Sequence, residues 1–185
     1  MQSPTDPLRR EQVLNVFCTA IEAKRDLLIN LDKREYAYSR VKGSVNVDLR
    51  KWHDLGPHLC SADVIKIAST SGLQIDFSEL KNGTQAKNIL GVNNRIQLEH
   101  VLPVDQIISI ILATKKGEDL RELVKETSCT AWILESEDKK IREKSFRDSP
   151  KKSYKTAGIN LLERSENQWK KFDWKKIEYW SRKPR

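Results

Sequence analysis

Cysteines and long apolar runs are both scarce in this sequence. Its 185 residues include three cysteines, Cys18, Cys60 and Cys129, and no two of them form a CxxC pair. Such an odd, widely spaced set argues against a disulfide framework and a cysteine zinc site, and favours a reducing compartment. No run approaches the roughly 20 apolar residues of a membrane-spanning helix. The start, MQSPTDPLRREQ, lacks the apolar segment of a secretory signal peptide. We therefore expect a cytoplasmic protein without a membrane partner.

Charged residues make up much of what the sequence does contain. They account for 32% of the chain, whereas apolar residues account for 38%, below the usual range of a globular domain. Apolar clusters nevertheless recur along the chain, which argues against wholesale disorder. The 34 Lys and Arg residues outnumber the 26 Asp and Glu residues, which gives a net charge of +8. This excess predicts a polyanionic partner, with nucleic acid (DNA before RNA) as the first choice and an anionic membrane surface as the second.

The hydrophobic periodicity predicts helices and strands without an internal repeat. Apolar residues three and four positions apart predict a helix over 8–31. Alternating β-branched and aromatic residues around Gly43 predict a short hairpin in YAYSRVKGSVNVDL. Ser61 is expected to cap a short helix over 62–70, which Gly72 ends.

The middle of the chain is expected to alternate between strands and helices. The pattern of RIQLEHVLP predicts a strand over 96–103. Helices are expected from Val104 and over 118–125, and the β-branched run TSCTAWIL predicts a buried strand over 127–134. Ser136, followed by two acidic residues, is expected to begin the next helix, because negative charge is favourable in a helix's first turn.

The composition becomes basic and aromatic after residue 150. The spacing in WKKFDWKKIEYW predicts an amphipathic helix, and we favour packing on the body over base stacking for Trp169, Trp174 and Trp180. Cationic side chains in this region are expected to contact nucleic-acid phosphates. They are Lys151, Lys152, Lys170, Lys171, Lys175, Lys176 and Arg182.

Glu99 and His100 are the residues with the clearest chemical potential. They lie at the end of the predicted strand 96–103, where neighbours point to opposite faces, so both reach one ion only if the strand twists or bulges. Phosphodiester hydrolysis requires an activated water, a cation for the developing charge and a proton for the leaving oxygen. The neutral imidazole of His100 is a natural general base. Glu99 supplies a hard oxygen ligand suited to Mg²⁺ or Mn²⁺.

The order of strand, long connection, strand and helix resembles the HNH or ββα-metal endonuclease superfamily. The similar branch is written roughly as EHVVP, then VVVT-x-E-E-H-x-x-L, then AGI, and the resemblance covers about residues 96–162. The matching residues are Glu99, His100, Val101, Pro103, Ile133, Glu137, Asp138, Ile141, Tyr154, Ala157, Gly158 and Ile159.

The resemblance implies that the helix carries a closing metal ligand. The family often has a histidine there, whereas this chain has Asp138, a carboxylate that suits Mg²⁺ and disfavours a zinc-preferring site. The implied site has Glu99 and His100 as catalytic residues. Its single Mg²⁺ or Mn²⁺ ion is held by Glu99, Glu137 and Asp138. The asparagine in the superfamily's name has no secure counterpart in this chain.

Structural roles remain open for the same residues. His100 could be a hydrogen-bonded histidine at a sheet edge, and Glu137 with Asp138 could simply cap a helix. The histidines and cysteine of WHDLGPHLC have a spacing compatible with zinc, but they lack a fourth ligand, so a loop with a Gly-Pro turn is favoured. The functional alternatives to a nuclease are a non-catalytic nucleic-acid-binding module and an interaction subunit of a larger complex.

The sequence as a whole predicts an α+β protein. We expect a helical or mixed scaffold over 1–95, a ββα-metal-like nuclease core over 96–162, and a basic, tryptophan-rich segment over 163–185. The expected function is divalent-metal-dependent hydrolysis of phosphodiester bonds in nucleic acid, with a histidine as general base.

Overall fold

Helices and a mixed sheet together form an α+β structure, as predicted. The computed structural model describes residues 7–53, 58–77, 80, 83–114, 119–143, 149–165 and 168–182. The chain divides into two compact units, of which the first comprises residues 1–55, 102–128 and 176–185, and the second comprises 56–101 and 129–175. This division differs from the expected boundaries near 95 and 162, because each unit is assembled from separated stretches of chain.

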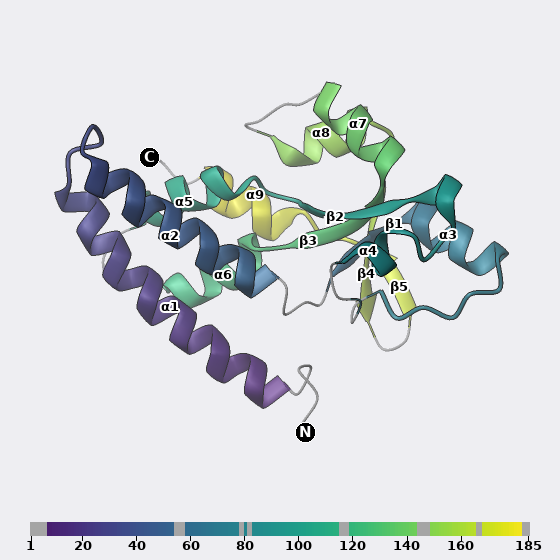
Figure 1. Ribbon diagram of the computed structural model, residues 1–185, viewed down its shortest axis with the longest axis horizontal. Helices are drawn as coiled ribbons and strands as arrows, with labels where there is room; N and C mark the ends of the chain where they lie inside the picture. Colours follow the sequence, from purple (N-terminus) through teal and green to yellow (C-terminus); the bar gives the residue numbers. More distant parts are fainter. Residues whose placement is uncertain are drawn as a thin grey trace. The chain divides into compact units, whose positions relative to one another are not determined.

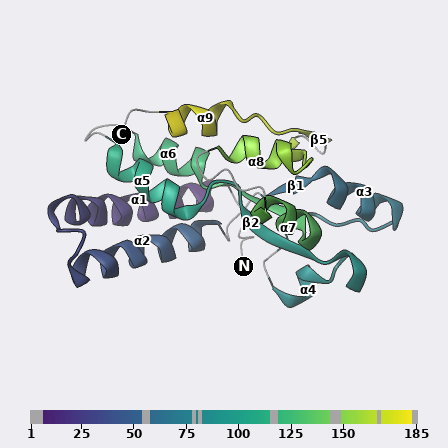
Figure 2. The same ribbon diagram turned by 90° about the horizontal axis from the view of Figure 1, so that it is seen from above.

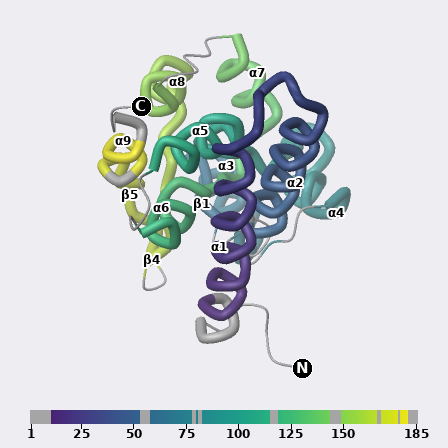
Figure 3. Tube along the Cα trace, turned by 90° about the vertical axis from the view of Figure 1, so that its left-hand side faces the viewer, coloured from purple at the N-terminus to yellow at the C-terminus, as the bar shows by residue number. Residues whose placement is uncertain are grey.

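The first unit is built from helices. Figure 1 shows α1 and α2 as an antiparallel pair, and Figure 3 shows α5 and α6 beside them, in agreement with their packing contacts. The prediction of a helix over 8–31 is confirmed. The helices are α1 (Pro7–Asn30), α2 (Tyr36–His53), α5 (Val104–Ala113), α6 (Leu120–Thr127) and most of α9 (Lys175–Arg182). No described helix combines the length and the apolar character that crossing a bilayer would require.

The predicted hairpin around Gly43 is wrong, because this stretch lies inside α2. Val45, Leu49 and Trp52 recur four and three residues apart and are all buried. Such spacing puts them on one helix face, and the ring of Trp52 meets Phe17 of α1 with centroids 6.3 Å apart. Burial of this face therefore decides the conformation, and the β-branched residues between its members do not form a strand.

The second unit contains a five-stranded sheet in the described part of the chain. Its strand order is β2–β3–β1–β4–β5, with β1 parallel to β3 and the other neighbouring pairs antiparallel. The strands are β1 (Leu59–Ser61), β2 (Ile96–His100), β3 (Thr130–Leu134), β4 (Leu161–Ser165) and β5 (Gln168–Lys171). The accompanying helices are α3 (Ala62–Thr70), α4 (Thr84–Lys87), α7 (Glu135–Glu143) and α8 (Pro150–Thr156), with a 3₁₀ turn η1 (Val92–Asn94) before β2.

Local signals in the sequence account for several element ends. The Ser61 hydroxyl accepts a hydrogen bond from Val64 N at 3.2 Å, which caps α3 as predicted. Gly72 follows that helix with a φ of 68°, a backbone angle that favours glycine. The predicted strands around Glu99 and Trp132 are confirmed as β2 and β3, and Trp132 is fully buried in the core of this unit.

The tail is only partly the amphipathic helix that its aromatic spacing predicts. Trp169 lies on β5 and packs partly against the core of the second unit, so the helix prediction is wrong for this residue. Helix α9 begins at Lys175, whose N–H donates to Asp173 Oδ1 at 3.0 Å. Trp180 is buried and its Nε1–H donates to Glu126 Oε2 at 2.7 Å, which confirms packing as its role.

Candidate functional site

Two antiparallel strands and a helix form the frame of the predicted site. β2 and β3 pair in continuous register from Ile96 opposite Leu134 to His100 opposite Thr130. Helix α7 begins directly after β3 and packs against both strands; Figure 2 shows it beside β2. The predicted neighbourhood of strand, strand and helix is therefore present in the second unit.

Glu137 anchors the start of α7 to the sheet. Its Oε2 accepts hydrogen bonds from Leu134 N at 2.8 Å and from the Ser61 hydroxyl at 2.7 Å. Burial raises the pKa of this carboxyl, and the two hydrogen bonds offset part of that rise. The residue thus joins α7 to β3 and β1, which is the helix-capping role that the sequence left open.

Asp138 is buried beside an exposed arginine one turn along α7. Arg142 Nε lies 2.7 Å from Asp138 Oδ2, and the side chains are 71% and 8% exposed, respectively. The hydrogen bond and charge of Asp138 raise the pKa of Arg142, with a smaller contribution from Glu99. Any cation that binds Asp138 must therefore compete with a guanidinium that can swing into solvent.

The charges of Glu99, Asp138 and Glu137 all act on one buried phenol. Tyr154 of α8 is 2% exposed, and its hydroxyl has no hydrogen-bond partner among the described residues. Burial raises the pKa of Tyr154, and the negative charges of Glu99, Asp138 and Glu137 raise it further, in that order. All three predicted metal-ligand carboxylates are thus close enough to Tyr154 to act on it electrostatically.

The side chain of His100 leaves β2 on the face opposite to that of Glu99. Because the register with β3 shows no bulge, Glu99 shares a face with Ala131, whereas His100 shares a face with Thr130. On that face Thr130 Oγ1 lies 2.6 Å from Nδ1 of the buried His58. The structure therefore places Glu99 and the α7 carboxylates within electrostatic range of Tyr154, and it places His100 on the face of β2 opposite to Glu99.

The donors beside Tyr154 suit a hard cation better than zinc. In the described part of the chain, no three His, Cys, Asp or Glu side chains are arranged to hold a metal ion. Mg²⁺ is commonly bound through one or two carboxylates while it keeps several waters, and Glu99 with Asp138 provides such a pair. A closed zinc site would need four nitrogen or sulfur ligands, which this cluster does not offer.

The zinc alternative at WHDLGPHLC gains no support. His58 is buried, and its ring meets that of Trp132 edge-on, with centroids 6.1 Å apart. Burial raises the pKa of the Cys60 thiol, which keeps it protonated and poor at binding metal. The side chain of His53 lies outside the described residues.

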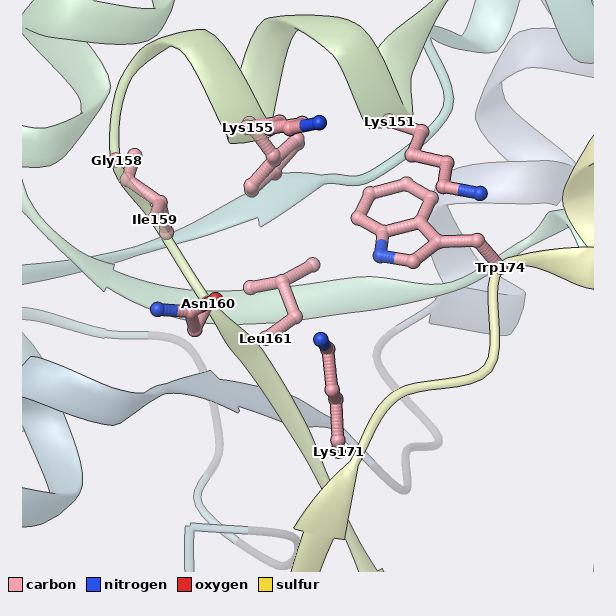
Figure 4. Close-up of a pocket in the computed structure, with 9 residues that line it drawn as sticks. Lys151, Lys155, Gly158, Ile159, Asn160, Leu161, Lys171 and Trp174 are labelled. Atoms are coloured by element: carbon pink, nitrogen blue, oxygen red, sulfur yellow. The ribbon is translucent and has the colours of Figure 1, made fainter.

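A basic pocket that Tyr154 also lines lies between α8, the start of β4, and β5. Its volume is about 420 Å³, and none of the described residues that line it is acidic. Figure 4 shows the Trp174 indole and the Lys171 side chain directed into it, below the α8 turns that carry Lys151 and Lys155. The lining residues are Lys151, Tyr154, Lys155, Gly158, Ile159, Asn160, Leu161, Lys171 and Trp174.

The predicted phosphate-binding residues do not form one cluster. Lys151 and Lys171 line the pocket, whereas Lys152 and Lys170 are exposed outside its lining. Lys175 is also exposed and lies at the start of α9; the side chains of Lys176 and Arg182 are outside the described residues.

Sequence reasoning did not identify Lys155, Asn160 or Trp174 as binding residues. The four-residue spacing of Lys151 and Lys155, which puts both on one face of a helix, was the available signal. The approach of β5 to α8 is a long-range contact and leaves no local pattern.

Comparison with known proteins adds no assignment. No family model, curated protein or solved structure significantly matches this chain. Function is therefore inferred from the residues of the site.

Proposed function

We propose that this chain is a divalent-metal-dependent nuclease that hydrolyses phosphodiester bonds in nucleic acid, preferentially DNA. The supporting observation is that the negative charges of Glu99 and Asp138 both act on Tyr154, and that the same tyrosine lines a pocket with three lysines. Carboxylates suited to a cation and ammonium groups suited to a phosphate are thus both found near one residue. The paired β2 and β3 strands with α7 packed across them support a ββα-metal type of core.

In this proposal Glu99 and Asp138 hold one Mg²⁺ or Mn²⁺ ion, with Glu137 fixing the start of their helix. The ion, when bound, lowers the pKa of a water molecule and stabilises charge on the phosphate. The lysines position the phosphodiester backbone by neutralising its charge. His100 accepts the proton of the attacking water, which requires its ring to come around the end of β2, since it leaves that strand on the opposite face.

A non-catalytic nucleic-acid-binding module is the second candidate. It is favoured by the ion pair that occupies Asp138 and by the two hydrogen bonds that Glu137 already accepts. In this case the acidic cluster is purely structural, and the basic pocket alone carries the function.

Cleavage assays separate the two candidates. Purified protein is incubated with plasmid DNA and with RNA, in EDTA, Mg²⁺ or Mn²⁺, and compared with the Asp138→Ala and His100→Ala variants. We expect metal-dependent cleavage that Asp138→Ala abolishes and excess Mn²⁺ partly restores. His100→Ala is expected to reduce cleavage about 100-fold or more, as for a lost general base, without rescue by Mn²⁺. Absence of cleavage of both substrates under all three conditions contradicts the nuclease proposal, and unchanged cleavage by His100→Ala contradicts the general-base role.

A further inference from the structure

The walls of the basic pocket combine three kinds of chemistry. Lys151 and Lys155 project from successive turns of α8, and Lys171 approaches from β5. Lys155 and Lys171 form no ion pair with any described carboxylate. A pocket with several ammonium groups and no acidic lining residue attracts a compact anion, and lysine commonly binds phosphate as a point charge.

Trp174 gives this pocket an aromatic wall. The indole is half-buried, and it touches Tyr154 and Phe172 at centroid distances of 5.5 and 5.2 Å. The interplanar angles are 53° and 71°, so neither neighbour stacks in parallel on it. A nucleic-acid base stacks on such a side chain without sequence preference, because every base has a π-face.

Asn160 adds a polar group on the side of the pocket away from Trp174 (Figure 4). Its backbone carbonyl accepts the N–H of Ala62 at 2.9 Å, which fixes the chain at the entry to β4. Its side chain is exposed and lines the pocket. A side-chain amide both donates and accepts hydrogen bonds, so it can meet the edge of a base or a phosphate oxygen.

We propose that this pocket binds one nucleotide unit with an unpaired base, with the phosphate on Lys155 and Lys171 and the base against Trp174. The proposal rests on the proposed function for its class of ligand, and it adds the strandedness of that ligand. A volume of about 420 Å³ is near the small end of ligand pockets, which span roughly 300–1,000 Å³. It accommodates a single nucleotide, whereas the paired bases of a duplex would remain stacked inside the helix and out of reach.

Binding without metal tests this proposal separately from cleavage. A fluorescently labelled single-stranded oligonucleotide and its duplex are titrated in EDTA, with fluorescence anisotropy as readout. The parent protein is expected to bind the single strand more tightly. Trp174→Leu should weaken single-strand binding about fivefold or more, since base stacking contributes about 1–3 kcal/mol, and change duplex binding less than about twofold. Trp174→Phe keeps an aromatic ring and should retain most of the affinity.

Lys171 and Lys170 form a matched pair of neighbouring, exposed lysines on β5. Lys171 lies opposite Leu162 and Lys170 opposite Glu163, so their side chains leave opposite faces. Lys171→Ala should lower single-strand affinity and reduce the slope of log affinity against log salt by about 0.7. Lys170→Ala should change the single-strand affinity and the salt slope less than Lys171→Ala does. Equal effects of the two substitutions would contradict a phosphate contact inside the pocket.

Competition with adenosine monophosphate and with inorganic phosphate identifies the source of the nucleotide. If adenosine monophosphate displaces the strand only at millimolar concentration, the ligand of the pocket is a polynucleotide. Displacement at micromolar concentration indicates that the ligand is a free nucleotide. Either result supports a nucleotide site if Trp174→Leu weakens the displacement, and equal displacement by inorganic phosphate contradicts it. Equal loss of single-strand and duplex binding in Trp174→Leu, with unchanged circular dichroism, also overturns the proposal. If the protein cleaves nucleic acid but Trp174→Leu leaves single-strand binding unchanged, the pocket assignment fails and the nuclease proposal stands. If Trp174→Leu weakens single-strand binding but the parent cleaves no nucleic acid, only the nuclease proposal is refuted.

Discussion

At the scale of single residues, the chemical potential of a side chain could be predicted from the sequence more readily than the direction in which it points. The residues Glu99 and His100 were identifiable because an acid and a histidine adjoin near the end of a strand. The strand rule that neighbours point to opposite faces also anticipated that they would separate, and the regular pairing of β2 with β3 places them so. Tyr154 could not be assigned its place within reach of the Glu99 charge, because the two residues are 55 positions apart and their proximity depends on long-range packing.

Glu137 should give the protein a measurable pH dependence. Burial raises its pKa above the usual value of 4.5, so stability is full when the carboxyl is protonated and falls as pH rises through the folded-state pKa. Glu137→Gln keeps an oxygen acceptor for Leu134 and Ser61 but cannot ionise. We expect its free energy of unfolding, relative to the parent, to increase with pH in urea titrations between pH 4.5 and 8.

Glu137→Ala serves as the contrasting variant. It leaves the buried Leu134 N–H and Ser61 hydroxyl without their acceptor, so it should be less stable than Glu137→Gln by about 1–3 kcal/mol at every pH, because neither variant can ionise at this position. Identical stability of the Gln and Ala variants would show that the two hydrogen bonds do not hold α7.

At the scale of elements, several helices and the strands β2 and β3 followed from local signals, whereas β1, β4 and β5 were not predicted. The main error lay where two periodicities overlap. Strand-forming residues in YAYSRVKGSVNVDL suggested a hairpin, yet Val45, Leu49 and Trp52 also have helical spacing, and their burial decides the outcome. In the tail, the pairing of β5 with β4 separates Trp169 from the helix that its spacing suggested. Long-range pairing of this kind is invisible to periodicity within a short window.

Gly43→Ala distinguishes the helix from the hairpin. Gly43 is exposed inside α2, and a Cβ there would meet open space. Alanine should therefore raise the free energy of unfolding by about 0.5–1 kcal/mol, because glycine is unfavourable in a helix interior. The control is Gly158→Ala, where φ is +74° and alanine is strained; it should destabilise. Destabilisation by Gly43→Ala, measured by urea unfolding, would speak against α2.

Gly158 also explains part of the AGI match in physical terms. The N–H of Ile159 donates to Tyr154 O, and that of Gly158 donates to Lys155 O. These two bonds form a Schellman motif at the end of α8, which favours glycine at the left-handed position. The match is therefore what a capped helix requires, and it would occur in proteins without nuclease activity.

At the scale of the whole molecule, the expected helices and strands predicted the α+β class, but their order in the sequence did not predict the units. The sheet takes β1 from residues before the expected core and β5 from residues after it. The lysines after residue 150 likewise belong to different elements, since Lys155 of α8 and Lys171 of β5 line one pocket. Units made of separated stretches cannot be recognised from local changes in composition.

The fragment 96–162 should therefore not fold alone. It contains β2, β3 and α7 but lacks β1, which pairs with β3 on the side away from β2. An unpaired edge beside the buried Trp132 would expose apolar surface and backbone groups. We expect poor dispersion in its proton NMR spectrum and no cooperative thermal transition. A cooperative transition like that of the full chain would contradict this prediction and support 96–162 as a core that folds independently.

Mn²⁺ binding in the absence of nucleic acid tests the central claim most directly. Electron paramagnetic resonance of free Mn²⁺ measures how much ion the full-length parent and its variants take up. If Glu99 and Asp138 hold the ion, the parent binds one Mn²⁺, and both Glu99→Gln and Asp138→Ala weaken binding at least tenfold. Arg142→Gln, which removes the guanidinium that occupies Asp138, should bind more tightly than the parent. Absence of Mn²⁺ binding by both the parent and Arg142→Gln, or binding that neither carboxylate substitution changes, would contradict the metal site and with it the nuclease.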